Sequence, residues 1–447
     1  MLRTGRASCL AGTITRQLFA VSRHTTHELA RVESRDNRQA SRCEWFNVAT
    51  ADDKVVGTLR RAATGVRVRA FCSAGGRHDG ACLLRGQSAT MPTAMKLRIH
   101  QFDLPLRHTF TIARGSHDVQ PTVVVELEQD GQRGYGEATE CEYYGFPRSR
   151  IVEGIELVRS VVEGERLEDE PLKTERLDDP AALWMRLQPA LIDNPFALCA
   201  IDQAAYDLWG KLRGQPVWKL WELSISTGRL PPTDYTIGID RVDVMVAKMR
   251  EFPDWPVYKI KLGTPHDLEI VRGLRRHTDA VFRVDANCGW SADETIANAR
   301  ELEKLGVEFI EQPLPPERWE DMARVYMESV LPVVADESCI TERDVARCRG
   351  FFHGVNIKLV KCGGLTPARR MIDNARKLGL KVMVGCMTES SVGISAIAQL
   401  LPLLDWVDMD GALLLSRDVA TGVTIERGVC RYPEVNGCGV TLLGEGD

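Results

Sequence analysis

The sequence predicts an α/β protein built on a parallel (β/α)8-type barrel, with a separate α+β unit before it. Eight short apolar stretches recur between residues 235 and 410, and the starts of the last seven lie 22–28 residues apart. Amphipathic helical patterns fill the intervals, for example over 293–305, 366–378 and 391–403. Strands that alternate with helices at this spacing are typical of parallel barrels. A doubly wound open sheet is the alternative, but no GxGxxG or GxxxxGK[ST] sequence opens any of the helices.

The composition narrows the functional classes. Of 447 residues, 44% are hydrophobic and 27% are charged, and the formal net charge is −5. This balance is typical of a globular protein and argues against a nucleic-acid partner. No run approaches the roughly 20 consecutive apolar residues of a membrane-spanning helix, so we expect no membrane partner. The 13 cysteines contain no CxxC pair, which favours reduced thiols and a cytoplasmic location.

Residues 1–94 differ in composition from the rest of the chain. The first 90 residues hold 15 Lys and Arg against 7 Asp and Glu. Their short apolar pieces do not form the apolar core of a signal peptide. A transit peptide or a nucleic-acid tail is the alternative, but acidic residues are interspersed among the basic ones. We expect a disordered or mis-started extension that carries no chemistry.

An α+β unit is expected over residues 95–232. Residues 96–104 alternate between polar and apolar, residues 122–128 are β-branched and apolar, and Asp130-Gly131 predicts the turn that follows. Helical patterns come next, over 149–163, 180–191 and 195–211. Pro231-Pro232 marks the exit into the barrel, which we expect over residues 233–411.

Nearly every barrel strand ends in an ionisable residue, and active sites of parallel barrels lie at that end. A single charged strand end is usually a solvated rim residue, but seven of eight are hard to attribute to solvation. They are Lys259 and Lys261, Asp285, Glu311, Asp336 and Glu337, Lys358 and Lys361, Glu389, and Asp408 and Asp410.

Three of these acids end consecutive strands and are therefore expected to be neighbours: Asp285, Glu311 and Asp336. Three carboxylates at low dielectric repel one another and take up protons unless a cation holds them. Oxygen ligands with open positions for a substrate suit Mg²⁺. Zinc is disfavoured, because no histidine follows His353 and no cysteine pair accompanies the acids. For each acid alone, a helix N-cap or a salt bridge is the alternative.

The lysines are expected to face one another across the ring. Lys259 and Lys261 lie two apart on one strand and point to the same side, and Lys358 ends a strand four further round. A partly desolvated ammonium beside a metal loses proton affinity, so we expect lysines with lowered pKa that act as bases. Two such groups can remove a proton from one face of a carbon and return one to the other. Salt bridges with the acids are the alternative, and Schiff-base chemistry would leave the three acids unexplained.

Five motifs in order carry a family resemblance. They are Lys-Ile-Lys-Leu (259–262), Asp-Ala-Asn (285–287), Glu-Gln-Pro (311–313), Ala-Asp-Glu-Ser (335–338) and Asn-Ile-Lys-Leu-Val-Lys-Cys-Gly-Gly (356–364). With these motifs, the chain from about residue 95 to its end resembles the muconate-lactonizing subgroup of the enolase superfamily. The resemblance implies a (β/α)7β TIM-like barrel. It also implies that the α+β unit is a capping domain, completed by residues of about 412–447.

The same resemblance implies individual roles. The residues are Asp285, Glu311 and Asp336 for one Mg²⁺ ion per subunit, Lys261 and Lys358 as opposed acid/bases, and Lys259 for the substrate carboxylate. The common reaction step removes a proton α to a carboxylate, and the metal stabilises the resulting enediolate. No histidine follows the sixth strand, which indicates the lysine–lysine branch and not the mandelate branch with its His-Asp pair.

Three further elements resemble the dipeptide epimerases of this subgroup. Asp408 and Asp410 form an Asp-x-Asp element that can hold the α-ammonium of an N-terminal residue, with a salt-bridged rim pair as the alternative. Loop 110–116 is similar to a mobile loop that covers the pocket, and its Arg114 can pair with a side-chain carboxylate, which favours Ala-Glu. An exposed loop arginine without a partner is the alternative. Loop 386–391 is similar to a substrate loop, which implies contacts from Thr388, Glu389 and Ser390.

The sequence therefore predicts Mg²⁺-dependent epimerisation of a dipeptide at its C-terminal residue, L-Ala-D/L-Glu first, in peptidoglycan peptide metabolism. An N-succinylamino acid racemase or o-succinylbenzoate synthase is the enzymatic alternative, although neither substrate has a free ammonium for Asp408 and Asp410. A non-enzymatic barrel that binds a ligand is disfavoured, because all five metal and acid/base residues are present. We expect a small-molecule dipeptide as the partner and a homo-oligomeric assembly, as is usual in the family.

Overall fold

The computed structural model describes residues 94–167, 179–225 and 230–444, together with the backbone of seven short strands between residues 7 and 83. The chain divides into two compact units, residues 1–92 and 93–447. The strands of the first unit are β1 Ala7–Cys9, β2 Leu18–Val21, β3 Ala30–Arg31, β4 Ser41–Ala51, β5 Lys54–Arg61, β6 Val68–Ser73 and β7 Cys82–Leu83. They form two sheets, in the orders β1-β4-β5-β6 and β3-β2-β7. The side chains of the expected extension 1–94 lie outside the described residues apart from residue 94, so its lack of chemistry stays a prediction.

The second unit opens with an antiparallel meander of β8 (Lys96–Ile112), β9 (Gly115–Gln129) and β10 (Gln132–Thr139), in the order β10-β9-β8. The predicted turn at Asp130-Gly131 joins β9 to β10. Both turn residues have positive φ, 50° and 79°, as a two-residue turn of type I′ requires. The predicted turn is therefore confirmed.

Within the described residues, four α-helices lie between the meander and the barrel: α1 Arg148–Glu163, α2 Pro180–Leu187, α3 Pro195–Arg213 and α4 Val217–Leu220. Helix α3 is the centre of this part, because every residue from Phe196 to Gly210 is buried. Asn194 caps it by accepting a hydrogen bond from the amide of Ala197, and Gly214, with φ of 65°, ends it. Helix α2 ends earlier than predicted because Pro189 cannot continue the helical hydrogen bonds.

Eight parallel strands form one sheet in sequence order. They are β11 Tyr235–Ile237, β12 Val257–Lys261, β13 Val281–Asp285, β14 Val307–Glu311, β15 Val333–Ala335, β16 Gly354–Lys358, β17 Lys381–Gly385 and β18 Trp406–Asp408. A parallel bridge between Thr233, just before β11, and Val407 in β18 closes the ring. The predicted parallel barrel is confirmed, and the doubly wound alternative is excluded.

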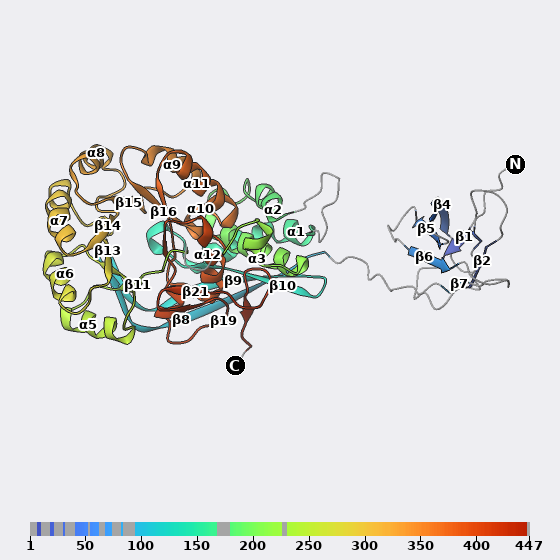
Figure 1. Ribbon diagram of the computed structural model, residues 1–447, viewed down its shortest axis with the longest axis horizontal. Helices are drawn as coiled ribbons and strands as arrows, with labels where there is room; N and C mark the ends of the chain where they lie inside the picture. The colour runs from blue at the N-terminus through green and yellow to red at the C-terminus, as the bar shows by residue number, and fades with distance from the viewer. Residues whose placement is uncertain are drawn as a thin grey trace. The chain divides into compact units, whose positions relative to one another are not determined.

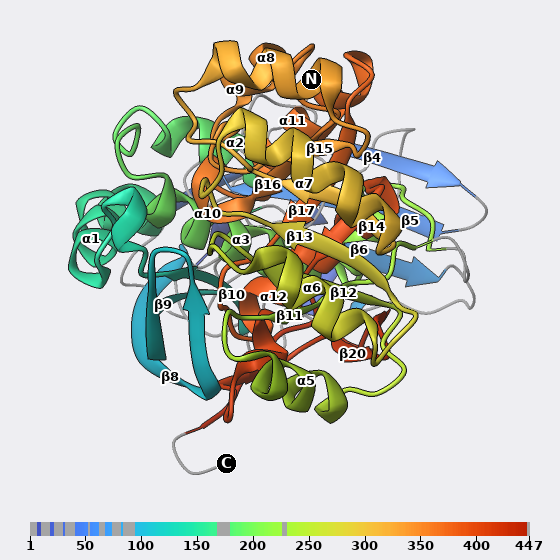
Figure 2. The ribbon, with the colours of Figure 1, turned by 90° about the vertical axis from the view of Figure 1, so that its left-hand side faces the viewer.

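Helices connect each strand to the next. They are α5 Val242–Glu251, α6 Asp267–Arg275, α7 Ala292–Lys304, α8 Trp319–Glu328, α9 Glu342–Cys348, α10 Leu359–Cys362 with α11 Leu365–Lys377, and α12 Ser391–Ala398. Figure 1 shows α5 to α8 along the outer side of the strands, and Figure 2 shows them from the front. Helix α12 is shorter than predicted, because Pro402 interrupts the pattern and Leu401–Leu403 forms a separate 3-10 turn.

The C-terminal segment returns to the α+β unit. It carries β19 Ala420–Thr421, β20 Thr424–Glu426, β21 Val429–Arg431 and β22 Thr441–Leu442. Lys211 Nζ of α3 donates to the carbonyl of Val440 (2.7 Å), and the amide of Cys438 donates to Asp207 Oδ1 (2.7 Å). Since residues 93–447 form one compact unit, the limits 95–232, 233–411 and 412–447 remain a proposed division.

The barrel interior has an apolar floor below a charged layer. Phe309, Val334 and Met383, with Trp406 packed against them, form a small core of their own. Residues two positions further along the same strands point to the same side, which places Glu311 above Phe309 and Asp408 above Trp406. Arg283 bridges the layers: its guanidinium lies 5.4 Å from the centre of the Phe309 ring and pairs with Asp234 Oδ2 at 2.9 Å. The mouth of the barrel is thus the polar end.

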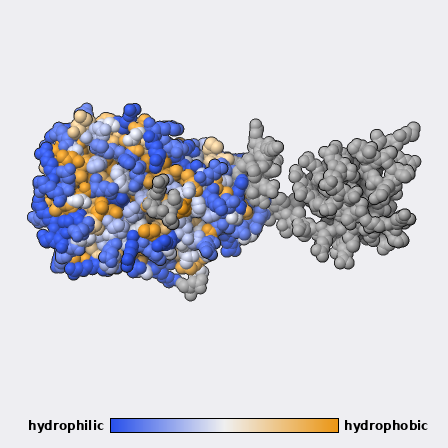
Figure 3. Space-filling view, viewed as in Figure 1, coloured by the Kyte–Doolittle hydropathy of each residue, from blue (hydrophilic) through white to orange (hydrophobic). Residues whose placement is uncertain are grey.

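The outer surface is mainly hydrophilic on the face drawn in Figure 3, where apolar residues lie in small separate groups. Within the described residues, no helix combines the length and the apolar character that crossing a bilayer requires.

Two glycines of β10 allow the meander to pack closely on α3. A Cβ atom at Gly136 would overlap the carbonyl oxygen of Ala200, and one at Gly134 would overlap that of Ala204. These obstacles are helix backbone, which cannot rotate away, so only glycine permits this distance between sheet and helix.

Gly136→Ala is expected to destabilise the protein by about 3 kcal/mol or more, because overpacking against rigid neighbours costs about 1–3 kcal/mol even where side chains can adjust. Urea unfolding followed by far-UV circular dichroism measures this change. Gln132→Ala, at an exposed position of the same strand, is the control and should change stability by no more than about 0.5 kcal/mol. Equal stability of the two variants would contradict the packing described above.

Candidate active site

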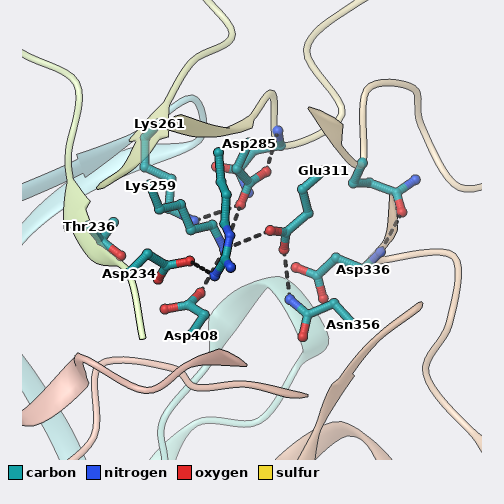
Figure 4. Close-up of polar contacts among 12 residues, drawn as sticks. Asp234, Thr236, Lys259, Lys261, Asp285, Glu311, Asp336, Asn356 and Asp408 are labelled. Atoms are coloured by element: carbon teal, nitrogen blue, oxygen red, sulfur yellow. Dashed lines mark hydrogen bonds and ion pairs between the residues drawn. The ribbon is translucent and has the colours of Figure 1, made fainter. Parts of the chain in front are cut away.

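Three carboxylates from consecutive strands meet inside the carboxyl end of the barrel (Figure 4). Asp285 ends β13, Glu311 ends β14 and Asp336 follows β15, and each is at most 1% exposed. One oxygen from each lies within 4.8 Å of the other two. Strand pairing dictates this proximity, because Asp285 and Glu311 are in register. The structure therefore brings together the three acids predicted to hold a metal.

The donor set of this cluster fits a divalent cation. One oxygen of each acid is held in place: Asp285 Oδ1 by the amide of Asn287 (2.9 Å), Glu311 Oε1 by Asn356 Nδ2 (2.8 Å) and Asp336 Oδ1 by Lys361 Nζ (2.6 Å). Glu311 Oε2 is buried and accepts no hydrogen bond of good geometry from the described residues, although Lys259 Nζ lies 2.8 Å away. Three buried anionic oxygens with fixed orientation are what Mg²⁺ prefers in proteins.

The pKa values of the three acids diverge. Burial, followed by the charge of Asp285, raises the pKa of Glu311 to about 7. Burial also opposes ionisation of Asp336 and Asp285, but nearby lysines outweigh it and lower both pKa values. The lysines responsible are Lys358 and Lys361 for Asp336, and Lys261 and Lys259 for Asp285. A cation is therefore the remaining source of positive charge that would keep Glu311 ionised at neutral pH.

Lysines flank the carboxylates on two sides. Lys261 Nζ, from β12, lies 2.7 Å from Asp285 Oδ2, and Lys358 Nζ, from β16, lies 2.8 Å from Asp336 Oδ2. Both side chains are buried near the mouth, each residue being 8% exposed. Lys259 lies deeper, 2.7 Å from Asp408 Oδ2 and 2.8 Å from Glu311 Oε2.

Among the protein's own groups, the carboxylates raise the pKa values of Lys259 and Lys358. The lowering was expected beside a bound metal and stays a prediction. Burial does lower the pKa of each ammonium, but the facing carboxylates raise it further, chiefly Asp408 for Lys259 and Asp336 for Lys358. A divalent cation on the three acids would offset that negative charge and act in the opposite direction.

Two residues fix the position of Asp336. Gln312 Oε1 accepts hydrogen bonds from the amides of Asp336 (2.9 Å) and Ser338 (3.1 Å), which ties the end of β14 to the loop after β15. Gln312 has φ of 34°, a left-handed conformation that a non-glycine residue adopts only when its surroundings hold it. Lys361 Nζ donates to the carbonyl of Asp336 (2.6 Å) and to that of Cys339 (3.1 Å). These contacts hold Asp336 in place beside the other two acids.

Asp408 and Asp410 lie together at the end of β18, with Cys386 beside them. Asp410 Oδ2 accepts a hydrogen bond from the amide of Thr236 (2.5 Å), and Asp408 pairs with Lys259. Burial and then the charge of Asp408 raise the pKa of Asp410 to about 8, whereas Lys259 offsets burial and lowers that of Asp408. A bound ammonium beside them would supply the positive charge that Asp410 lacks.

The predicted substrate loop lies between β17 and α12, and Thr388, Glu389 and Ser390 are all buried. Ser390 is held by the meander, since its hydroxyl donates to Glu137 Oε2 (2.5 Å) and its amide to the same carboxylate. Glu389 Oε2 is buried without a hydrogen bond from the described residues. Burial and the charge of Glu137 raise the pKa of Glu389 to about 8. Contacts of these three residues with substrate stay a prediction.

Arg114 reaches the mouth of the barrel from the turn between β8 and β9. Its Nη1 lies 2.8 Å from Glu337 Oε1 and 3.3 Å from the carbonyl of Asn287. Arg114 therefore has a partner within the chain, so neither the free loop arginine nor an arginine reserved for substrate describes it fully.

Three residues of the site had no role expected from the sequence: Gln312, Glu137 and Lys361. Gln312 stands inside a quoted motif and Lys361 follows a strand end, so their positions were visible although their contacts were not. Glu137 gave no signal, because nothing in residues 132–139 indicates that this carboxylate meets loop 386–391. A partner 253 residues away can be recognised only in three dimensions.

Two family models match the chain: "Mandelate racemase / muconate lactonizing enzyme, N-terminal domain" over residues 94–221 and "Enolase C-terminal domain-like" over 243–446. An L-Ala-D/L-amino acid epimerase of Flavobacterium johnsoniae is 56% identical over 78% of this chain and 100% of its own. An L-Ala-D/L-Glu epimerase of Bacteroides thetaiotaomicron is 40% identical over 78% of this chain and 88% of its own.

Solved structures agree with these relatives. A dipeptide epimerase of Methylococcus capsulatus, complexed with Mg and L-Arg-D-Lys, has a TM-score of 0.68 and 30% identity over 78% of this chain and 99% of its own. A dipeptide epimerase of Enterococcus faecalis, complexed with Mg and L-Leu-L-Tyr, has a TM-score of 0.69 and 28% identity over 78% and 99%. The sequence motifs, the closed barrel and its acidic cluster agree with these matches: the chain belongs to the mandelate racemase/muconate lactonizing enzyme family of the enolase superfamily and is an isomerase.

Proposed function

We propose that this protein is a Mg²⁺-dependent dipeptide epimerase that inverts the α-carbon of the C-terminal residue, with L-Ala-D/L-Glu as the first substrate to test. One observation carries the proposal: two lysines flank a buried cluster of three carboxylates from opposite strands of a closed ring. The epimerase relatives, and the Mg and dipeptides held by related structures, support it.

The ring fixes the relative directions of these groups. In a closed ring of eight strands, β12 and β16 are opposite each other, and so are β14 and β18. Lys261 and Lys358 therefore approach the centre along one diameter. The acidic cluster and the Asp408–Asp410 pair face each other along the other diameter. A dipeptide lying along the second diameter presents the α-carbon of its C-terminal residue to both lysines, with one lysine on each face.

The side chains can then carry out a 1,1-proton transfer. When bound, Mg²⁺ stabilises the negative charge that develops on the substrate carboxylate as the α-proton leaves. One lysine removes the α-proton, and the other delivers a proton to the opposite face, which inverts the centre. Asp285 and Asp336 orient the two amines through the 2.7 and 2.8 Å ion pairs. Lys259 lies beside Glu311, where it can support the substrate carboxylate.

An N-succinylamino acid racemase or o-succinylbenzoate synthase is the alternative, and a solved N-succinyl Arg/Lys racemase of Bacillus cereus is 25% identical with a TM-score of 0.67. Such substrates carry no free α-ammonium, so they lack the group that we propose to bind at Asp408 and Asp410. The expected cytoplasmic location, homo-oligomeric assembly and role in peptidoglycan peptide metabolism stay predictions.

Lys261→Ala and Lys358→Ala should each reduce epimerisation by at least about 100-fold, because each removes the acid/base on one face. Each variant should still exchange the α-proton of one epimer with solvent deuterium, and the two variants should differ in which epimer they exchange. Proton NMR of L-Ala-L-Glu and L-Ala-D-Glu in D₂O measures both the rate of epimerisation and the exchange of the α-proton. Unimpaired epimerisation by either variant would refute the two-lysine mechanism.

Removal of divalent metal with EDTA should abolish turnover, and Mg²⁺ should restore it. Mg²⁺ should also raise the thermal unfolding midpoint of the metal-free protein, since a free concentration of about 100 times Kd stabilises by about 2.7 kcal/mol. Asp336→Asn should lose this shift, whereas Asp243→Asn, at the exposed start of α5, should keep it. An equal shift in both variants would place the ion elsewhere.

The wild-type enzyme should epimerise L-Ala-L-Glu at least about 100-fold faster, by kcat/KM, than N-acetyl-L-Ala-L-Glu, because a buried carboxylate pair without its ammonium is costly. Asp410→Asn should narrow this preference to less than about tenfold. Chiral chromatography of both reactions gives the ratio. Equal use of the acetylated and free dipeptides would favour the N-succinylamino acid alternative.

A further inference from the structure

We infer that Glu337 neutralises Arg114 at the site for the C-terminal side chain, so that the enzyme accepts uncharged side chains, carboxamides above all, about as readily as a carboxylate. The inference rests on the proposed function, and it narrows the substrate class of the same site. The paired Arg114 and Glu337 then offer the substrate side chain both a donor and an acceptor, and they do not select for an acidic side chain.

The loop that carries Arg114 is docked on the barrel. The carbonyl of Thr111 accepts a hydrogen bond from the amide of Ile239, just after β11 (2.9 Å). A Cβ at Gly263, after β12, would lie 2.9 Å from the Cβ of Ala113. Arg114 thus lies over the mouth, and its guanidinium carbon stands 4.1 Å from the centre of the Tyr143 ring.

The charge of Arg114 is balanced by a residue that cannot turn away. The Glu337 side chain is 1% exposed, against 30% for that of Arg114, and the two are 2.8 Å apart. If Arg114 moved to a substrate carboxylate and left Glu337, it would leave a buried charge without its partner, which is strongly unfavourable. A glutamate side chain would also bring a negative charge close to Glu337. The pair therefore offers no net positive charge to an acidic substrate.

The ring order indicates which part of the dipeptide meets this pair. Asn287 and Glu337, the contacts of Arg114, follow β13 and β15, so the pair lies above the acidic cluster. The Asp408–Asp410 pair is on the opposite side of the ring. A dipeptide with its ammonium at Asp408 and Asp410 and its carboxylate at the acidic cluster therefore has its C-terminal side chain near Arg114.

The pair retains hydrogen-bonding capacity of both kinds. Within the described residues, Arg114 donates only through Nη1, which leaves Nε and Nη2 as donors. Glu337 Oε2 is buried and accepts no hydrogen bond from the described residues. A carboxamide matches both, since its oxygen accepts from the guanidinium and its NH₂ donates to the carboxylate. A carboxylate side chain satisfies only the first.

The test compares L-Ala-L-Gln with L-Ala-L-Glu, which differ only in this group, by kcat/KM measured as solvent deuterium exchange. Wild-type enzyme should use the two within about tenfold of each other. Glu337→Gln should shift the ratio toward L-Ala-L-Glu by at least about tenfold, and Arg114→Gln should shift it toward L-Ala-L-Gln by a similar factor. The double variant, in which both charges are gone, should return to within about threefold of the wild-type ratio.

The ratio cancels any general loss of activity caused by the proximity of Glu337 to Asp336. If Glu337→Gln fails to fold by circular dichroism, the wild-type ratio and Arg114→Gln decide together: a wild-type ratio within about tenfold with a tenfold shift in Arg114→Gln supports the inference, and an unchanged ratio in Arg114→Gln overturns it. Wild-type enzyme that uses L-Ala-L-Glu more than 100-fold better than L-Ala-L-Gln also overturns it, while dipeptide epimerisation stands. Absence of turnover on any dipeptide by Mg²⁺-loaded enzyme overturns the proposed function and this inference with it.

Discussion

The repulsion among three buried carboxylates is the constraint on which the rest of the site depends. Asp285, Glu311 and Asp336 have oxygens within 4.8 Å of one another and almost no exposure to water. Water cannot screen their charges there, so the barrel supplies Lys259, Lys261, Lys358 and Lys361 around them. Lys261 and Lys358 among them are the proposed acid/bases, and a divalent cation at the centre would release these amines from part of their role as counter-charges.

Closure of the ring sets the directions from which the amines approach the carboxylate cluster. Strand register alone brings the acids together, but only a closed ring places Lys358 opposite Lys261. The α+β unit contributes the rest of the enclosure. Its Glu137 holds loop 386–391 in place, and its β8–β9 turn brings Arg114 to Glu337. The proposed metal and acid/base residues thus all lie on the barrel, while the proposed substrate-contacting residues come from both parts.

The sequence sufficed for the barrel and for the acids, because strand spacing and charged strand ends depend on local pattern. The ends of helices α2 and α12 were predicted too late, near Pro189 and Pro402. The amphipathic pattern continues past each proline, but the helical hydrogen bonds do not, because proline has no backbone N–H. The sequence could not predict the partners of Arg114, Ser390 and Lys259. Each partner lies far away in the sequence and is brought close only by the three-dimensional packing of the chain. The carboxylate of Asp336, which raises the pKa of Lys358, is likewise a partner that only the folded barrel brings to this amine.

The central claim is that one α-carbon lies between two amines that approach from opposite faces. A crystal structure of the enzyme with Mg²⁺ and a dipeptide measures this directly. We expect the ion on Asp285, Glu311 and Asp336, the dipeptide ammonium at Asp408 and Asp410, and the α-carbon of the C-terminal residue between Lys261 Nζ and Lys358 Nζ. Both amines on the same side of the dipeptide, or an ion bound away from the three acids, would contradict it.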